Sequence, residues 1–290
     1  MTTIDRETND IRIYLNYLSY EIAKQSGFER AVLAHHDLIQ DSFKKKPFFF
    51  KSIFNSSRFI ILLFILSVYY TSEPSYIEDV KRRCGRIDLI SMNSISSFIM
   101  TLRVLGLIKV IKSDFDNRKL TYYLTERALL EAKTLINSMA KPLMEIFSGD
   151  YCVNSNESLR YFFINYSKII FTGNFMHLIH PASSTFIMRD SGHMIITSIY
   201  VKYIRSKALS FDFELVNVAK ECGVSRSHLK RCLNDAEKNG FLTLCTSKRK
   251  ISITSKFIEM AERYMAIYLS AIYFGFRRKS PPKYVNYNNC

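Results

Sequence analysis

The sequence predicts a mainly helical chain of the α+β class, in which two similar units each join three helices to a small β-hairpin. Glycine and proline are scarce, at 9 and 6 of 290 residues, which disfavours turn-rich β architectures and glycine-looped nucleotide sites. Apolar residues recur at helical spacing through most of the chain. The length suggests two domains, which we place at residues 1–150 and 151–290.

An internal repeat supports the two-unit prediction. Residues 79–85 resemble residues 217–223, and both stretches end in Cys-Gly. Residues 105–108 resemble residues 239–242 in the same order along the chain. Because the landmarks keep their order at offsets of 138 and 134 residues, we expect a tandem duplication.

The N-terminal part is predicted as one helix over residues 10–40, followed by a basic linker. We expect Phe48, Phe49 and Phe50 of this linker to pack under the N-terminal helices; contact with a membrane surface is the alternative. The twelve-residue apolar run at 59–70 is too short to span a bilayer, so it predicts a buried helix and no membrane insertion.

Each unit is expected to run helix, helix, turn, helix and hairpin. In the first unit the helices are at 58–70, 75–84 and 91–105, and the strands at 108–111 and 119–124. Further helices are expected at 128–147 and 158–170. In the second unit the helices are at 193–205, 213–222 and from Ser225 to Gly240, and the strands are at 241–245 and 250–254. A last helix is expected to run to Phe274 and to be followed by a basic tail.

This order is that of a winged helix-turn-helix, whose third helix can enter the major groove of DNA. For the second unit the expected DNA-binding residues are Ser225, Arg226, Ser227, His228, Lys230, Arg231 and Asn234 on the helix, and Lys248, Arg249 and Lys250 on the hairpin. Arg suits guanine, Asn suits adenine, and the hairpin cations suit phosphates. An ordinary solvated helix with a basic loop is the alternative.

The first unit has a less charged third helix. Its expected DNA-binding residues are Asn93, Ser94, Ser97, Thr101 and Arg103 on the helix, with Asn117, Arg118 and Lys119 on the hairpin. Hydroxyl groups can contact bases but release few counterions. Packing against protein is therefore the alternative for this unit.

The charge distribution points to a polyanionic partner. The chain carries a formal charge of +15, with +7 on residues 193–256 and zero on residues 126–192. Excess charge confined to two blocks fits nucleic acid or an acidic membrane surface. We expect the partner to be double-stranded DNA.

One stretch resembles a known family. Residues 105–108 with 114–126, ending in Leu124-Thr125-Glu126, are similar to the hairpin region of MarR-type winged helix-turn-helix transcriptional regulators. The similarity covers about residues 55–135; the second unit lacks the Asp-Arg pattern. The resemblance implies a bacterial, cytoplasmic regulator that dimerises, here as an internal pseudo-dimer or as a homodimer. It also implies that a small-molecule effector binds to the regulator. The aromatic segment from Tyr161 to Phe175 is one candidate pocket lining, and core packing is the alternative.

No sequence pattern supports catalysis. Glycine-rich phosphate loops, G-x-S-x-G and H-E-x-x-H are absent, so we expect no enzyme and no cofactor. His177 and His180 are three apart, but nothing completes a metal set. Cys84 and Cys222 are expected to be small buried residues; the alternative is a redox switch in which Arg82 and Arg83 lower the pKa of Cys84. A plasmid-type replication initiator and a protein-interaction module remain alternative functions.

Overall fold

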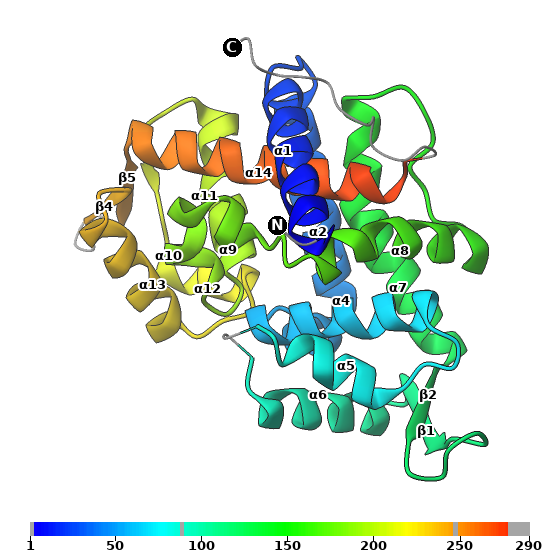
Figure 1. The fold of residues 1–290 in the computed structure, drawn as a ribbon. Coiled ribbons are helices and arrows are strands. Elements are labelled where there is room, and N and C mark those ends of the chain that lie inside the picture. Colours follow the sequence, from blue (N-terminus) through cyan, green and yellow to red (C-terminus); the bar gives the residue numbers. More distant parts are fainter. Residues whose placement is uncertain (1–2, 88–89, 246–248, 278–290) are drawn as a thin grey trace.

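The computed structural model describes residues 3–87, 90–245 and 249–277 (Figure 1). The chain is mainly helical and carries two small antiparallel sheets, which confirms the predicted α+β class. Helices from both ends of the chain meet at the centre. There α1 (Thr3–Ala23) crosses the long C-terminal helix α14 (Ser255–Gly275), and Arg263 donates to Asn16 Oδ1 at 2.8 Å.

The single helix expected over residues 10–40 is wrong. The chain forms α1 and a second helix, α2 (Phe28–Lys45), separated by a turn at residues 24–27. The turn brings Gly27 against the backbone of Glu145, where a Cβ atom would lie 1.8 Å from the carbonyl oxygen. Arg30 then donates to the Glu145 carboxylate at 3.0 Å, so the break is fixed by contacts more than a hundred residues away.

The expected linker contains a short helix, α3 (Pro47–Ile53), which leads into α4 (Ser56–Thr71). Phe50 is fully buried as expected, whereas Phe48 is 90% exposed. Helix α4 lies in the core, with Leu63 to Val68 buried. Among the described residues no single helix is long and apolar enough to cross a membrane. Only α3 and α4 taken together pass by length and composition, and they are bent by 92°.

Two segments have the same order of elements. The first contains α4, α5 (Ile77–Cys84), α6 (Met92–Val104), β1 (Ile108–Lys112) and β2 (Leu120–Leu124), and Tyr76 forms a bridge with Thr121 of β2. The second contains α11 (Gly192–Ser206), β3 (Ser210–Asp212), α12 (Leu215–Glu221), α13 (Arg226–Lys238), β4 (Leu242–Cys245) and β5 (Lys250–Ile253). Strand β3, which the sequence pattern missed, pairs with β5 just as Tyr76 bridges to β2.

Matching hydrogen bonds close each segment. Gly106 and Gly240 both have positive φ values, 65° and 72°, which turn the chain from helix into strand. Thr125 Oγ1 donates to the Gly106 oxygen at 2.8 Å, and Thr254 Oγ1 donates to the Gly240 oxygen at 2.9 Å. Each threonine also caps the next helix. The same side chain thus fastens the same turn in both segments.

The remaining elements join the two segments. They are α7 (Glu126–Ala140), the 3-10 helices η1 (Lys141–Glu145) and η2 (Pro181–Ser183), α8 (Asn156–Phe171), α9 (Met176–Ile179) and α10 (Ser184–Ile187). Helix α7 ends earlier than expected because the chain tightens into η1 before Phe147. Helix α8 packs against both α4 and α14.

A buried chain of hydrogen bonds crosses the centre. His35 Nδ1 lies 3.2 Å from the Ser138 carbonyl oxygen, which can only accept, so this nitrogen carries the proton. His35 Nε2 then accepts from His193 Nε2 at 2.7 Å, and His193 Nδ1 accepts from the Tyr264 hydroxyl at 2.6 Å. In this arrangement both imidazoles are neutral and each of their nitrogens has a partner. The chain connects α2, α7, α11 and α14.

Acid should destabilise the fold through these histidines. Burial lowers the pKa of both His35 and His193 below the ordinary value of 6.5. The unfolded chain therefore takes up protons as pH falls below 6.5, while the folded chain does not. We expect a loss of about 2 kcal/mol between pH 6.5 and pH 5 for each histidine that stays neutral, measured by urea unfolding.

The double variant His35→Phe, His193→Phe is the matched comparison. It should be less stable than wild type at pH 7, because the Ser138 carbonyl and the Tyr264 hydroxyl lose their partners. Its unfolding free energy should fall less steeply from pH 6.5 to 5. An identical slope for the two proteins would contradict the assignment.

Candidate nucleic-acid interface

Helix α13 presents one face to the core and the opposite face outward. Ser225 caps its first turn by accepting from the His228 backbone N–H at 3.1 Å. The inward residues Leu229, Cys232, Leu233 and Ala236 are all fully buried. Their spacing holds the helix on its segment, so the remaining side chains must point away.

Most of the predicted residues of α13 share this outward face. Arg226, Ser227, Lys230 and Arg231 are exposed and Asn234 is partly exposed. Within the described part of the chain, Arg226, Lys230 and Arg231 form no ion pair with an acidic side chain. The structure therefore brings together three cations whose charge no described neighbour neutralises, as binding to phosphates requires.

His228 lies on the flank of the helix and is already engaged. Its Nε2 donates to the Asp190 carbonyl oxygen at 3.1 Å, and the side chain is partly buried. Asp235, one turn from Arg231, forms an ion pair with Arg189. The sequence pattern missed both contacts because they join α13 to a segment about 40 residues earlier, outside any helical period.

The hairpin of the second segment carries basic side chains, and one of them forms an ion pair. Arg249 has a positive φ of 50° and donates to the Glu214 carboxylate at 3.0 Å, which ties the hairpin to the start of α12. Lys250, the first residue of β5, is exposed. Lys248, the third predicted cation, lies outside the described residues.

The first segment places its predicted residues on the matching surface. On α6, Asn93, Ser94, Ser97 and Arg103 are exposed, and Thr101 is partly exposed and donates to the Ser97 carbonyl at 3.0 Å. On the hairpin, Asn117, Arg118 and Lys119 are exposed. Asp116 accepts from the Arg118 backbone and lies 3.6 Å from Lys119 Nζ, so it partly offsets the positive charge there.

Direct comparison of α6 with α13 shows how far the two faces differ. Both helices are capped by serine, Ser91 and Ser225, and both end before a glycine at the same offset of 134 residues. At that offset the cations Arg226, Lys230, Arg231 and Lys238 correspond to Met92, Ser96, Ser97 and Val104. Equivalent positions are therefore cationic on α13 and neutral on α6.

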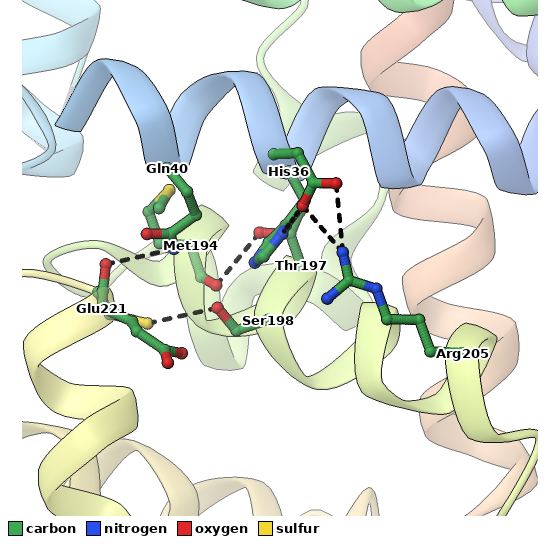
Figure 2. Close-up of polar contacts among 9 residues, drawn as sticks. His36, Gln40, Met194, Thr197, Ser198, Arg205 and Glu221 are labelled. Atoms are coloured by element: carbon green, nitrogen blue, oxygen red, sulfur yellow. Dashed lines mark hydrogen bonds and ion pairs between the residues drawn. The ribbon is translucent and has the colours of Figure 1, made fainter. Parts of the chain in front are cut away.

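Helix α2 lies outside the second segment and forms hydrogen bonds with α11 and with the end of α12. Arg205 of α11 (labelled in Figure 2) donates to Asp37 of α2, with Nη2 at 2.9 and 3.2 Å from the two carboxylate oxygens. On the same side of α2, Gln40 donates to the Glu221 carbonyl at the end of α12, at 3.3 Å. Ser198 of α11 contacts the Cys222 sulfur at 3.7 Å. These contacts fix the positions of α11 and α12, and these helices support α13.

Cys84 and Cys222 lack the exposed thiol of lowered pKa that a redox switch requires. Cys84 and Cys222 are fully buried, as expected, and burial raises the pKa of each thiol to about 12. The idea that Arg82 and Arg83 lower the pKa of Cys84 is wrong, because Arg82 pairs with Asp79 and Arg83 lies over the Phe171 ring. No group of three His, Cys, Asp or Glu side chains in the described ranges could hold a metal ion.

Comparisons with protein-family models, curated proteins and solved structures gave no match.

The two serine caps yield a stability prediction. Ser225→Ala and Ser91→Ala should each lower the free energy of unfolding by about 1 kcal/mol, because each leaves a first-turn N–H without its partner. Ser225→Asp should keep most of the stability, since aspartate also caps. Urea unfolding measures all three. Wild-type stability for both alanine variants would show that the caps contribute nothing.

Proposed function

We propose that the chain is a sequence-specific regulator of transcription that binds double-stranded DNA through two winged helix-turn-helix units. The observation that carries the proposal is the outward face of α13, a capped helix on which Arg226, Lys230 and Arg231 are exposed and pair with no described acidic side chain. A helix of this kind, followed by a basic hairpin, suits the major groove with phosphate contacts beside it.

The roles of the side chains follow from their placement. Arg231 and Asn234 lie near the middle of the outward face of α13, where base edges would be reached, and arginine can bind guanine with two hydrogen bonds. Arg226 at the first turn and Lys250 on the hairpin suit phosphates. His228 holds Asp190, so we assign it to positioning of the helix.

Fewer observations support DNA binding by the first unit. Its α6 offers hydroxyl and amide groups with one cation, Arg103, and its hairpin offers Arg118 and Lys119. Met92, Met100 and Val104 of α6 are 50, 54 and 81% exposed. This apolar exposure favours a second candidate function for the first unit alone, contact with another protein.

The packing of α1 on α14 supports an internal pseudo-dimer. Helices from the two ends of one chain make the long crossing that two subunits would make in a dimer. Two unequal reading helices on one chain would suit an asymmetric operator, because operator symmetry mirrors protein symmetry. The resemblance of residues 105–126 to MarR-type regulators supports the same assignment.

Selection of bound sites from a random duplex pool tests the function. We expect an enriched sequence with two unequal parts. Direct repeats would favour a replication initiator, and binding without enrichment would indicate non-specific coating. No binding at low salt would contradict the proposal.

Arg231→Ala tests base reading by α13. On the selected duplex we expect a loss of about 1–3 kcal/mol in binding free energy, and relaxed preference at one base pair. Arg160→Ala on α8 removes the same charge from an exposed site elsewhere and should leave binding nearly unchanged. An equal loss on selected and scrambled duplexes would mean that Arg231 contacts phosphate only.

A further inference from the structure

An open cleft of about 540 Å³ lies where the turn from α3 to α4 faces the start of α13. On one side it is lined by Phe48, Lys51 and Arg58. On the other side it is lined by Ser225 and Arg231 of α13. Phe48 and Lys51 belong to the basic linker, to which the proposed function gives no role. The cleft therefore joins side chains that lie far apart in the sequence.

Positive charge exceeds negative charge in the lining of this cleft. Lys51, Arg58 and Arg231 are exposed, and no acidic side chain in the described ranges forms an ion pair with them. Asp190 is the only carboxylate among the lining residues that the structure describes, and its Oδ1 accepts from Asn55 Nδ2 at 2.5 Å. Three cations against one carboxylate leave two positive charges unopposed, so the cleft attracts an anion.

Hydrogen bonds fix the two walls of the cleft against each other. The Asp190 carbonyl accepts from His228 of α13 at 3.1 Å, while the Asp190 carboxylate accepts from Asn55 at the start of α4. The next residue, Ser191, donates its backbone N–H to the Phe54 carbonyl at 2.8 Å. The cations therefore stand on a preformed surface, which reduces the entropy cost of binding.

The position of the cleft identifies the anion. Arg231 lines the cleft and also lies on the outward face of α13, so the two surfaces are continuous. In helix-turn-helix complexes the N-terminal residues of the recognition helix reach base edges in the major groove. A cleft beside that end of the helix would lie over the sugar–phosphate backbone that borders the groove. Lys51 and Arg58 suit its phosphates, and Phe48, which is 90% exposed, suits a deoxyribose.

A bilayer surface is the other anionic partner that basic and aromatic side chains suit. Helices that lie on a bilayer bury one continuous apolar face in it. Of the three linker phenylalanines, Phe50 is fully buried in the protein, Phe49 is partly buried and only Phe48 is exposed. One exposed ring beside a concave, cationic lining favours the DNA backbone over a flat bilayer.

We propose that the cleft binds the backbone of double-stranded DNA next to the groove that α13 enters, with Lys51 and Arg58 as phosphate ligands. This inference rests on the proposed function. It adds a contact that the second unit cannot make alone, because Lys51 precedes the first unit and Arg58 lies in the first helix of that unit. The bound duplex is therefore longer than the stretch that α13 contacts.

The salt dependence of duplex binding by the full chain measures these contacts. In the double variant Lys51→Ala, Arg58→Ala the slope of log K against log salt should be shallower by about 1.8, at about 0.9 for each phosphate. A rise from about 50 to 200 mM salt should then weaken wild-type binding about twelvefold more than binding by the variant. The change should be the same on selected and scrambled duplexes, because phosphates carry no sequence information.

Three single variants separate charge from fold. Arg58→Lys keeps the charge and should keep the wild-type slope. Arg160→Ala removes an exposed cation from α8 and should also leave the slope unchanged. Phe48→Ala should weaken binding about twofold to fivefold at an unchanged slope, because the ring is uncharged and loses only an apolar contact.

Hydroxyl-radical footprinting locates the contact on the duplex. The wild-type chain should protect sugars that flank the α13 site on one side. The double variant should lose this protection and keep the rest of the footprint. An unchanged footprint, or a slope equal to that of the wild type, would overturn the cleft as a DNA site and leave the proposed function standing.

Vesicles of phosphatidylserine and phosphatidylcholine test the bilayer alternative. We expect the double variant and the wild type to bind them equally weakly. Vesicle binding that the double variant loses, together with unchanged duplex binding, would assign the cleft to a membrane surface and overturn the inference. No duplex binding by the wild type would overturn the inference and the proposed function together.

Discussion

The hydrogen-bond chain from Ser138 through His35 and His193 to Tyr264 is the interaction on which the rest of the structure depends. Its members come from four helices in both halves of the sequence, and each of them has a hydrogen-bond partner when both imidazoles are neutral. Burial disfavours a charged imidazole at either position and lowers the pKa of both histidines. Both histidines are therefore neutral at pH 7, and their hydrogen bonds link α11 and α14 to α2 and α7.

The two segments beside this centre differ in the charge on their third helices, α6 and α13. The turn before helix α11 holds α13 through Arg189, which pairs with Asp235, and through the Asp190 carbonyl, which accepts from His228. The two segments share their turns and caps down to individual threonine contacts, yet their third helices differ in charge at equivalent positions. The two segments thus share their geometry, while the outward faces of their third helices differ in charge.

The sequence predicted those features that local rules determine. Helical spacing located α4, α6 and α13, and the start of α13 at Ser225 and its end at Gly240 were placed correctly. The break at Gly27, strand β3 and the engagement of His228 were missed, because each depends on a contact with a distant residue. The pairing of His35 with His193 is the clearest case: 158 residues separate them, and neither residue carries a local signal.

The most direct test of the account is the salt dependence of duplex binding when α13 carries the residues of α6. The variant Arg226→Met, Lys230→Ser, Arg231→Ser, Lys238→Val keeps the caps and the buried face of the helix. If the cations of α13 hold the phosphates, the slope of log K against log salt should become shallower by about 0.9 for each phosphate that the variant no longer binds, so by roughly 2 to 4 in all. A slope equal to that of the wild-type chain would contradict the assignment of α13 as the DNA-binding helix.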